Sequence, residues 1–265
     1  MRVRDRIATD ASFTVADLRI VEPRTAWSAP EAGAGYRMVF IRRGAFRLRI
    51  PGWEGLADPA TAYLGRPGDE QSIAHRPGRE DVCTEVGLDA AFARELRLDQ
   101  TPTHPVLTSG RLDLAHRALV ARARRGADGF ELAERIVWLA AELPRRADRR
   151  AGPAEMAPFR RRVVESAREL LTADPAWTGL DTLARRVGVS RSYLSRTFRS
   201  HTGETLTRFR NGLRLRAALD RIEAGETDLA GLAADLGFAD HAHLSRAMRA
   251  EVGHPPSRVR ALLSR

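Results

Sequence analysis

The chain has 265 residues and a formal net charge of +10 at pH 7, and every one of its 44 basic residues is an arginine. This length is sufficient for two domains with separate hydrophobic cores. The single cysteine, Cys83, excludes an internal disulfide and a zinc site built from several cysteines, and we expect it to be a small core residue. Because no apolar stretch approaches the roughly 18 residues of a membrane span and the N-terminus lacks an apolar signal core, we expect a cytoplasmic protein without a membrane partner.

The positive charge is unevenly distributed along the chain. Residues 1–110 carry 15 arginines and 15 acidic residues, whereas residues 158–265 carry 19 arginines and 12 acidic residues. Clustered positive charge is the electrostatic footprint of polyanion binding. A compositional bias toward arginine is the alternative source of the charge, so the charge alone does not decide the function.

Residues 1–110 are predicted to be mostly β-structure. Short segments rich in Val, Ile, Phe and Tyr are separated by Gly, Pro and Asp turns, which is typical of a small barrel or sandwich. The clearest strand candidates are 36–41, 45–50 and 81–86. Gly44 between the first two predicts a tight hairpin turn. Tyr36, Phe40 and Trp53 are candidates for a ligand pocket, with ordinary core packing as the alternative.

Residues 111–143 are predicted to form a helical hairpin. Apolar residues recur there at helical spacing, and Gly126 and Gly129 divide them into two helices. We expect the apolar stripe to pack on the barrel or on a second subunit of a homodimer. Residues 144–157 are rich in Arg, Ala and Pro without an apolar period, so we interpret them as an interdomain linker.

Residues 158–265 are predicted to be entirely helical. Ser190 and Asp240 are placed to cap helix N-termini, and glycines such as Gly188 and Gly203 fall where helices should end. Seven helices are expected, at 159–172, 180–187, 191–200, 205–223, 229–236, 241–251 and 257–263.

One pattern occurs twice within this helical region. Residues 183–203 and 232–253 each contain a short apolar helix, a break with a glycine, and a second helix with one basic face. Leu194-Ser195-Arg196 in the first copy corresponds to Leu244-Ser245-Arg246 in the second. This arrangement is typical of a helix-turn-helix unit, whose second helix enters the major groove of DNA.

The second helix of each copy has an apolar face and an opposite face with Arg and Ser. A helix buries the apolar face and exposes the other, and arginine forms a bidentate pair with guanine. The residues predicted to contact bases are Arg191, Ser192, Ser195, Arg196, His241, Ala242, Ser245 and Arg246. The residues predicted to contact phosphates are Ser190, Arg199 and Arg249.

The segment between the two copies is predicted to be one rigid helix. About 18 helical residues span ~27 Å at 1.5 Å per residue, and successive major grooves on one side of the duplex are ~34 Å apart. A connector of this length is suited to hold two recognition helices on one side of double-stranded DNA.

These motifs resemble those of the AraC/XylS family of transcription regulators. The matching residues include Leu183, Ala184, Gly188, Val189, Ser190, Tyr193, Leu194, Ser195, Arg196, Phe198, Gly203, Arg214, Ala233, Gly237, Phe238, Asp240, Leu244, Ser245, Arg246, Gly253, Pro256 and Arg260. The resemblance covers about 100 residues, and it implies two helix-turn-helix units joined by one long helix. For an activator, it also implies RNA polymerase as a partner.

The first half contains Arg43-Gly44-Ala45-Phe46, Asp58-Pro59, Arg66-Pro67-Gly68-Asp69 and the stretch 75–83. With these residues it resembles, less specifically, the cupin-like β-barrel that precedes this domain in many relatives. The resemblance implies that residues 1–110 sense a small-molecule effector, dimerise, or do both. We therefore expect an α+β protein of several domains, with a cupin-like barrel and helical hairpin followed by an all-α DNA-binding domain.

Two other functions compete with sequence-specific regulation. One is a cupin-type metalloenzyme with a DNA-binding appendage, but residues 1–110 contain only His75 and His104 as histidine ligands. The other is a nonspecific architectural DNA binder, which the sequence does not separate from a specific regulator. We expect no enzymatic activity, no metal and no cofactor.

Overall fold

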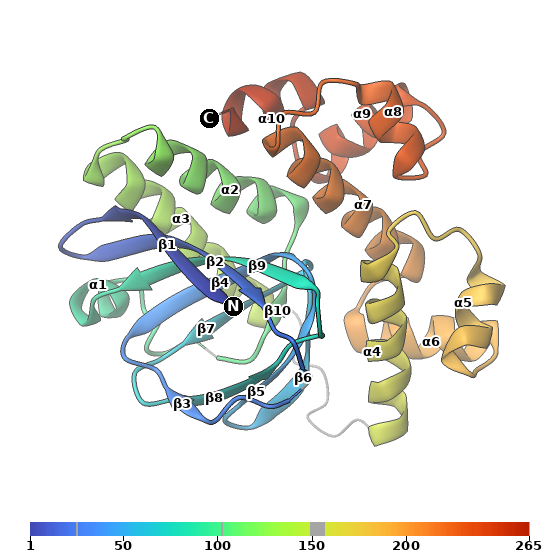
Figure 1. Cartoon of the computed structure of the whole chain (residues 1–265), viewed down its shortest axis with the longest axis horizontal. Helices are drawn as coiled ribbons and strands as arrows, with labels where there is room; N and C mark the ends of the chain where they lie inside the picture. Colours follow the sequence, from blue (N-terminus) through green and yellow to red (C-terminus); the bar gives the residue numbers. More distant parts are fainter. Residues whose placement is uncertain (25, 102, 149–156, 265) are drawn as a thin grey trace.

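The computed structural model describes residues 1–24, 26–101, 103–148 and 157–264 of the chain. Strands dominate the first 110 residues and helices the remainder (Figure 1). The strands are β1 (Arg2–Thr9), β2 (Phe13–Val21), β3 (Glu31–Ala32), β4 (Tyr36–Arg43), β5 (Phe46–Ile50), β6 (Trp53–Ala57), β7 (Thr61–Gly65), β8 (Glu70–Ala74), β9 (Glu80–Leu88) and β10 (Val106–Leu107). The helices are α1 (Ala90–Glu95), α2 (Gly110–Arg124), α3 (Gly129–Asp148), α4 (Pro158–Ala173), α5 (Leu180–Val187), α6 (Arg191–Thr202), α7 (Leu206–Glu223), α8 (Leu229–Asp235), α9 (His241–Glu251) and α10 (Pro256–Leu263).

The strands form two antiparallel sheets, as expected for a cupin-like domain. The larger sheet has the order β1-β2-β9-β4-β7-β10 and the smaller has the order β3-β8-β5-β6. Residues alternate between the two faces of each strand. In β4, for example, Met38 and Phe40 belong to the core under the helices, while Val39 and Ile41 belong to the core between the sheets. The three strands predicted from sequence are confirmed, with ends that differ by a residue or two.

The predicted hairpin turn at Gly44 is wrong in one respect. β4 lies in the larger sheet and β5 in the smaller, so the chain passes from one sheet to the other at this glycine. Gly44 has φ +82°, and a Cβ atom there would stand 1.9 Å from Oδ1 of Asp81. The position therefore requires glycine because of its backbone conformation and because of the carboxylate beside it.

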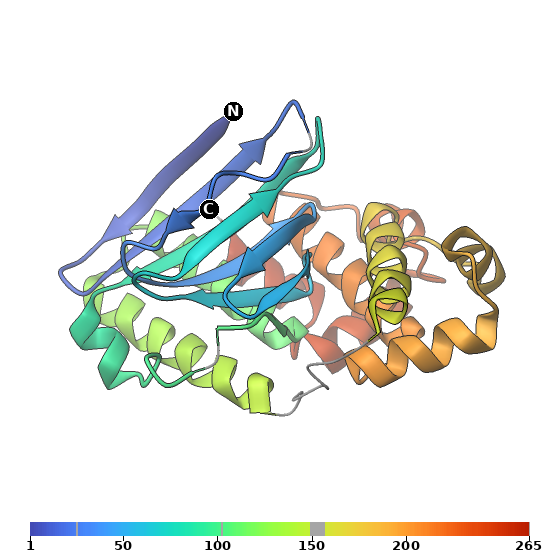
Figure 2. The same cartoon turned by 90° about the horizontal axis from the view of Figure 1, so that it is seen from below.

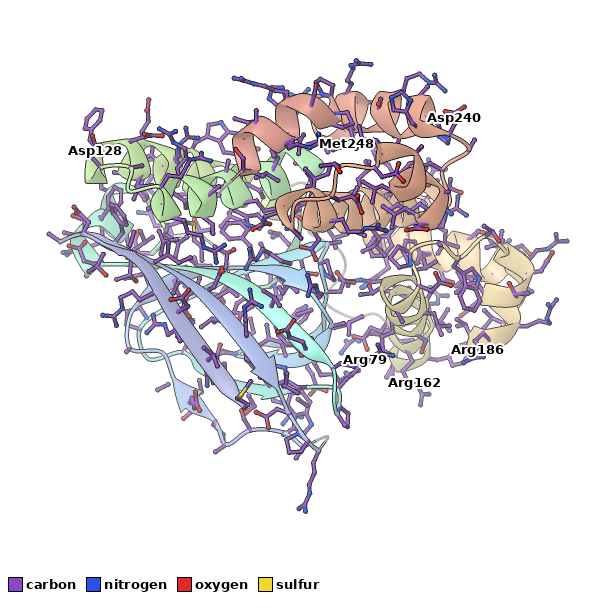
Figure 3. All side chains as sticks on the ribbon, turned by 45° about the horizontal axis from the view of Figure 1, so that its top comes forward. Arg79, Asp128, Arg162, Arg186, Asp240 and Met248 are labelled. Carbon is purple, nitrogen blue, oxygen red and sulfur yellow. The ribbon has the colours of Figure 1, made fainter. Side chains whose placement is uncertain are left out.

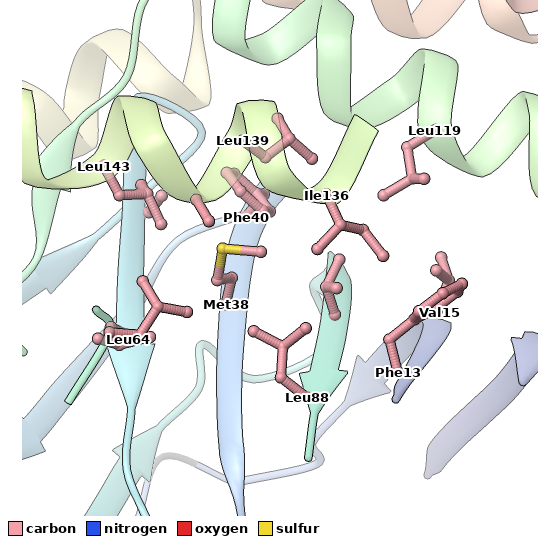
Figure 4. Close-up of a cluster of buried hydrophobic side chains, with 14 of the residues drawn as sticks. Phe13, Val15, Met38, Phe40, Leu64, Leu88, Leu119, Ile136, Leu139 and Leu143 are labelled. Atoms are coloured by element: carbon pink, nitrogen blue, oxygen red, sulfur yellow. The ribbon is translucent and has the colours of Figure 1, made fainter. Parts of the chain in front are cut away.

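α2 and α3 cover the outer face of the larger sheet and form the predicted helical hairpin (Figures 1 and 2). Figure 4 shows Leu119, Ile136 and Leu139 packed over Met38 and Phe40. This contact confirms that the apolar stripe packs on the barrel. The linker prediction is wrong at its start, because α3 continues through Pro144 to Asp148. The remainder of the predicted linker, 149–156, lies outside the described residues.

The seven helices predicted for residues 158–265 are confirmed as α4 to α10. Local signals explain this agreement, since Ser190 and Asp240 accept hydrogen bonds from the backbone N–H of Tyr193 and His243. Gly188 ends α5 in the left-handed conformation at φ +81°. Within the part of the chain that the structure describes, no helix has the length and hydropathy needed to cross a membrane.

The helices α4 to α10, here called the C-terminal domain, have two hydrophobic cores. The first core lies among α4, α5, α6 and the start of α7, and the second lies among the end of α7, α8, α9 and α10. Each core also includes residues from the preceding part of the chain, here called the N-terminal domain. Ala60 joins the first core, and Leu114 and Ala118 of α2 join the second.

Candidate nucleic-acid interface

Two helix-turn-helix units lie at the two ends of α7. The first consists of α5 and α6, and the second of α8 and α9. Leu194 and Phe198 of α6 are buried in the first core, where Phe198 meets Phe209 of α7 edge-on, with ring centroids 5.2 Å apart. Leu244 and Met248 of α9 are buried in the second core. Burial of these faces turns the opposite faces of α6 and α9 to solvent.

The exposed faces of α6 and α9 carry arginines with free guanidinium groups. Arg196, Arg199, Arg246 and Arg249 are exposed, and none forms an ion pair with any residue that the structure describes. In Figure 3, Asp240 at the start of α9 lies on the side of the molecule remote from the strands. These four side chains are therefore available to a polyanion without breaking an internal contact.

Arg214 of α7, in the same domain, is hydrogen-bonded to backbone carbonyl groups rather than free. Arg214 of α7 is buried and donates from Nε to the carbonyl of Pro175, from Nη1 to that of Gly237 and from Nη2 to that of Ala176. The distances are 2.9, 2.8 and 3.2 Å. Arg214 thus ties α7 to the loop between α4 and α5 and to the turn between α8 and α9, and its guanidinium is unavailable to DNA.

The first turns of the recognition helices are also exposed. Arg191, Ser192, His241 and Ala242 are accessible to solvent, as predicted for base contacts. Arg191 lies 2.8 Å from Asp181, but both side chains are more than half exposed, so the pair is weak and easily exchanged for a phosphate or base. The Ser190 hydroxyl accepts the capping hydrogen bond and retains its own hydrogen for a phosphate oxygen.

The structure corrects the prediction for Ser245. Its relative exposure is 9%, whereas its counterpart Ser195 is half-buried. The reason is that α9 packs against both α8 and α7, which covers this edge of the helix. A side chain so enclosed cannot reach a base edge, and the exposed stripe of α9 consists of His241, Ala242, Arg246 and Arg249.

An open groove of about 400 Å³ lies where the starts of α5 and α7 meet the outer face of α6. Its lining includes three arginines and no acidic side chain. The polar side chains along it are those of Thr178, Ser195, Arg196, Arg199, Thr205, Thr207 and Arg210. Helix N-termini favour anions because their first N–H groups are unpaired. No sequence pattern indicated Thr178 and Thr207, since their proximity to α6 depends on how α5 and α7 pack against it. Arg210 is one of the connecting-helix arginines for which the sequence left phosphate contact and solvation open.

The three aromatic residues predicted to line a ligand pocket are not brought together. Phe40 is buried under the helices, stacked on His116 with ring centroids 4.8 Å apart. Tyr36 is partly buried at the edge of that core, and Trp53 packs against the separate core between the sheets. Tyr36 and Phe40 share one face of β4, whereas Trp53 lies on β6 and packs on the other core, so the three side chains do not line one pocket.

A small hollow of about 70 Å³ lies between the two sheets instead. Tyr63, His75 and Cys83 are among its lining residues, and Nδ1 of His75 lies 2.6 Å from Oδ2 of Asp81. Burial raises the pKa of the Cys83 thiol, so the residue is an inert core thiol as expected. Across the described ranges, no group of three or more His, Cys, Asp and Glu residues is arranged to hold a metal ion.

Comparison with known proteins places this geometry among DNA-binding regulators. Residues 183–261 match a family model described as a helix-turn-helix domain. The chain is 39% identical over 92 residues to the HTH-type transcriptional regulator CdhR of Pseudomonas aeruginosa, which covers 34% of this chain and 26% of CdhR. It is 33% identical over 81 residues to the regulatory protein SoxS of Salmonella typhimurium, which covers 31% of this chain and 76% of SoxS.

A solved structure resembles the chain over nearly its whole length. ToxT from Vibrio cholerae aligns over 96% of this chain and 99% of its own, with a TM-score of 0.40 and 13% identity. The sequence matches span about a quarter of CdhR and three quarters of SoxS.

Proposed function

Because the chain belongs to the AraC/XylS family of transcription regulators, we propose that it is a sequence-specific regulator that reads two adjacent major-groove segments with α6 and α9. The observation that supports this most directly is the pair of exposed arginines on each helix, Arg196 with Arg199 and Arg246 with Arg249. None of them forms an ion pair with a described residue, although the charge of Arg246 acts on the carboxylate of Asp240. The 18 residues of α7 between the units span ~27 Å, which is suited to consecutive grooves on one side of a duplex.

We assign different contacts to the two arginines of each helix. Arg196 and Arg246 lie nearer the helix N-terminus, which enters the groove most deeply, and we assign them to base edges. Arg199 and Arg249 lie a turn further along and are assigned to phosphates. Thr178, Thr207 and Arg210 extend the phosphate contact along the groove beside α6, because a groove with three arginines and no carboxylate attracts the DNA backbone.

Selection of bound fragments from random or genomic DNA tests the proposal. A regulator should prefer its best fragment over random DNA by about a thousandfold or more at physiological salt. Equal affinity for all fragments would instead identify a nonspecific architectural DNA binder. Measurements at several salt concentrations are needed, because the phosphate contribution weakens steeply with salt.

We also propose that the chain forms a homodimer through the outer face of α3. Phe130 is 84% exposed, Trp138 is 45% exposed, and Val137 is also exposed. With Glu134 and Ala141 they form one helical face opposite the stripe that packs on the barrel. An apolar face with aromatic residues is typical of the centre of a protein interface.

We further propose that a small-molecule effector binds the N-terminal domain and controls DNA binding. If the regulator is an activator, RNA polymerase is a further partner. We place the protein in the cytoplasm with its DNA and assign it no catalytic activity. Stoichiometric iron, zinc or manganese in the purified protein would revive the alternative of a cupin-type metalloenzyme.

A further inference from the structure

Charged side chains of complementary sign face each other where α2 of the N-terminal domain lies along α7 of the C-terminal domain. Nε of Arg216 lies 2.8 Å from Oδ2 of Asp113. Nη1 of Arg117 lies 2.7 Å from Oδ1 of Asp220 and 2.7 Å from Oε2 of Glu223. We call these five residues, two on α2 and three on α7, the α2–α7 charge ladder.

Strand β4 of the N-terminal domain extends the charge ladder on its other side. Nη1 of Arg42 lies 3.1 Å from Oε1 of Glu223, and Nε of Arg43 lies 3.0 Å from Oδ2 of Asp220. Arg42 is also held by Asp17 of β2 at 2.7 Å. Arg117, at the centre, is only 1% exposed, so its two ion pairs are shielded from solvent, whereas Arg43 at the edge is exposed.

A second contact joins the N-terminal domain to α4, the helix that packs against both α5 and α6 of the first helix-turn-helix unit. Arg168 of α4 donates from Nε to Oδ2 of Asp58 and from Nη2 to Oγ1 of Thr61, both at 2.9 Å. Nearby, Nη1 of Arg47 lies 3.0 Å from Oε2 of Glu165. The N-terminal domain is therefore joined to the core of the first unit through α4 and to the core of the second unit through α2. In Figure 1, α4 and α7 both lie on the side of the C-terminal domain nearer the strands.

The order of the charges specifies one register between α2 and α7. Along α7 the sequence of signs is positive at Arg216 and negative at Asp220 and Glu223. A shift of one helical turn would place Asp220 against Asp113, two buried carboxylates in contact, which is strongly unfavourable. Buried ion pairs add little to stability compared with apolar packing, but here they select a single docked arrangement.

This docked arrangement leaves the DNA-facing arginines free. Arg196 and Arg246 remain exposed while the charge ladder is intact, so docking does not cover the recognition faces. Two helix-turn-helix units with a fixed relative orientation bind two adjacent groove segments more tightly than two units that move independently, because independent units lose conformational entropy on binding.

We propose that the N-terminal domain is a positioning element for DNA recognition, which holds α6 and α9 in the relation that the operator requires. Asp113, Arg117, Arg216, Asp220 and Glu223 are then positioning residues, although none contacts DNA. This inference rests on the proposed function. If undocking leaves only a fraction of molecules in the competent geometry, the apparent Kd rises by the reciprocal of that fraction.

Charge exchange within the full chain tests the proposal. The variants are Asp113→Arg, Arg216→Asp and the double exchange, with Glu95→Arg and Arg94→Asp as matched charge changes on exposed positions of α1. Each single variant at the charge ladder should bind the best selected fragment about tenfold more weakly, and its footprint should shrink from two groove segments to one. The double exchange should restore binding to within about threefold, and the α1 controls should bind like the wild type.

A variant could bind its fragment weakly because its domains are undocked or because less of the protein is folded, and the affinity for random DNA distinguishes these two causes. A folded but undocked chain keeps its phosphate contacts, so the affinity of every folded variant for random DNA should change little. Should Asp113→Arg not fold, Asp220→Asn and Glu223→Gln remove the attraction more gently and should give the same one-segment footprint.

The failure of the inference is distinguishable from the failure of the proposed function. A wild-type chain without fragment preference refutes the function. A wild type that prefers its fragment, together with single variants that bind it equally well or more tightly, refutes positioning alone. Tighter binding would mean that docking restrains the units rather than presents them.

Discussion

Arginines of the C-terminal domain fall into two physical environments that the sequence does not separate. Arg196 and Arg246 are exposed and make no ion pair with described residues, whereas Arg214 is buried and bonded to three carbonyl groups. The periodicity of α6 and α9 was sufficient to identify the exposed pair. The environment of Arg214 depends on two loops far away in the chain, so no local pattern predicts it.

Substitution of Arg196 tests the assignment to bases. Arg196→Ala should weaken binding to the best fragment by ~1–3 kcal/mol and relax the preference at one base position, because a bidentate contact to guanine is lost. Arg199→Ala should instead weaken binding to all sequences and lower the slope of log K against log salt by about one. Both are measured by competition binding at several salt concentrations. A uniform loss for Arg196→Ala would identify it as a phosphate contact.

Substitution of Arg214 should act on stability. Arg214→Ala removes the donors to the carbonyls of Pro175, Ala176 and Gly237 and should lower the free energy of unfolding by about 2–4 kcal/mol. Urea denaturation of the full chain measures the effect. Arg94→Ala, at an exposed position of α1, is the control and should change stability by less than about 0.5 kcal/mol. An Arg214 variant as stable as this control would contradict the structural role.

At the scale of elements, the sequence predicted the bounds of helices better than the packing of helices and strands against one another. The ends of α5 to α9 follow from caps and glycines, which are local signals. The burial of Ser245 contradicts the predicted exposure, whereas the core packing of Tyr36, Phe40 and Trp53 agrees with the alternative to a ligand pocket. Both outcomes depend on contacts between elements, which local patterns do not decide. The groove beside α6 was missed for the same reason, because it exists only after three helices have packed.

One face of α3 packs on the larger sheet, and the opposite, exposed face is the proposed dimer contact. Phe130→Glu together with Trp138→Glu should convert a dimer into a monomer, because two charges would be buried at the proposed apolar contact. Sedimentation equilibrium measures the association. Val3→Glu on β1, also an exposed apolar position, is the control and should leave the dimer unchanged. A wild-type chain that is already monomeric at the highest concentration would exclude this interface.

At the scale of the whole molecule, the contact between the domains includes a buried histidine. His116 of α2 stacks on Phe40, and its Nε2 lies 4.0 Å from Oδ1 of Asp113. Burial, and then the charges of Arg117, Arg42 and Arg216, lower the pKa of His116 well below its usual 6.5. The folded protein therefore holds this imidazole neutral at pH 7.

Protonation linked to His116 should lower the free energy of unfolding as the pH falls. The unfolded chain takes up a proton near pH 6.5, whereas the folded chain takes it up only at lower pH. Stability that is fully present above pH 6.5 should therefore be lost as pH falls from 6.5 toward the folded pKa, by up to about 1.4 kcal/mol per pH unit. Urea denaturation between pH 7.5 and 5.5 measures this slope. His116→Gln should make the slope shallower, and an unchanged slope would contradict the prediction.

The second core of the C-terminal domain has a consequence for domain-exchange experiments. Leu114 and Ala118 of α2 pack in that core together with Leu219 and Val259, so part of its interior comes from the N-terminal domain. A chimera with a different N-terminal domain would therefore have to supply a helix with matching apolar side chains and matching charge order at this position.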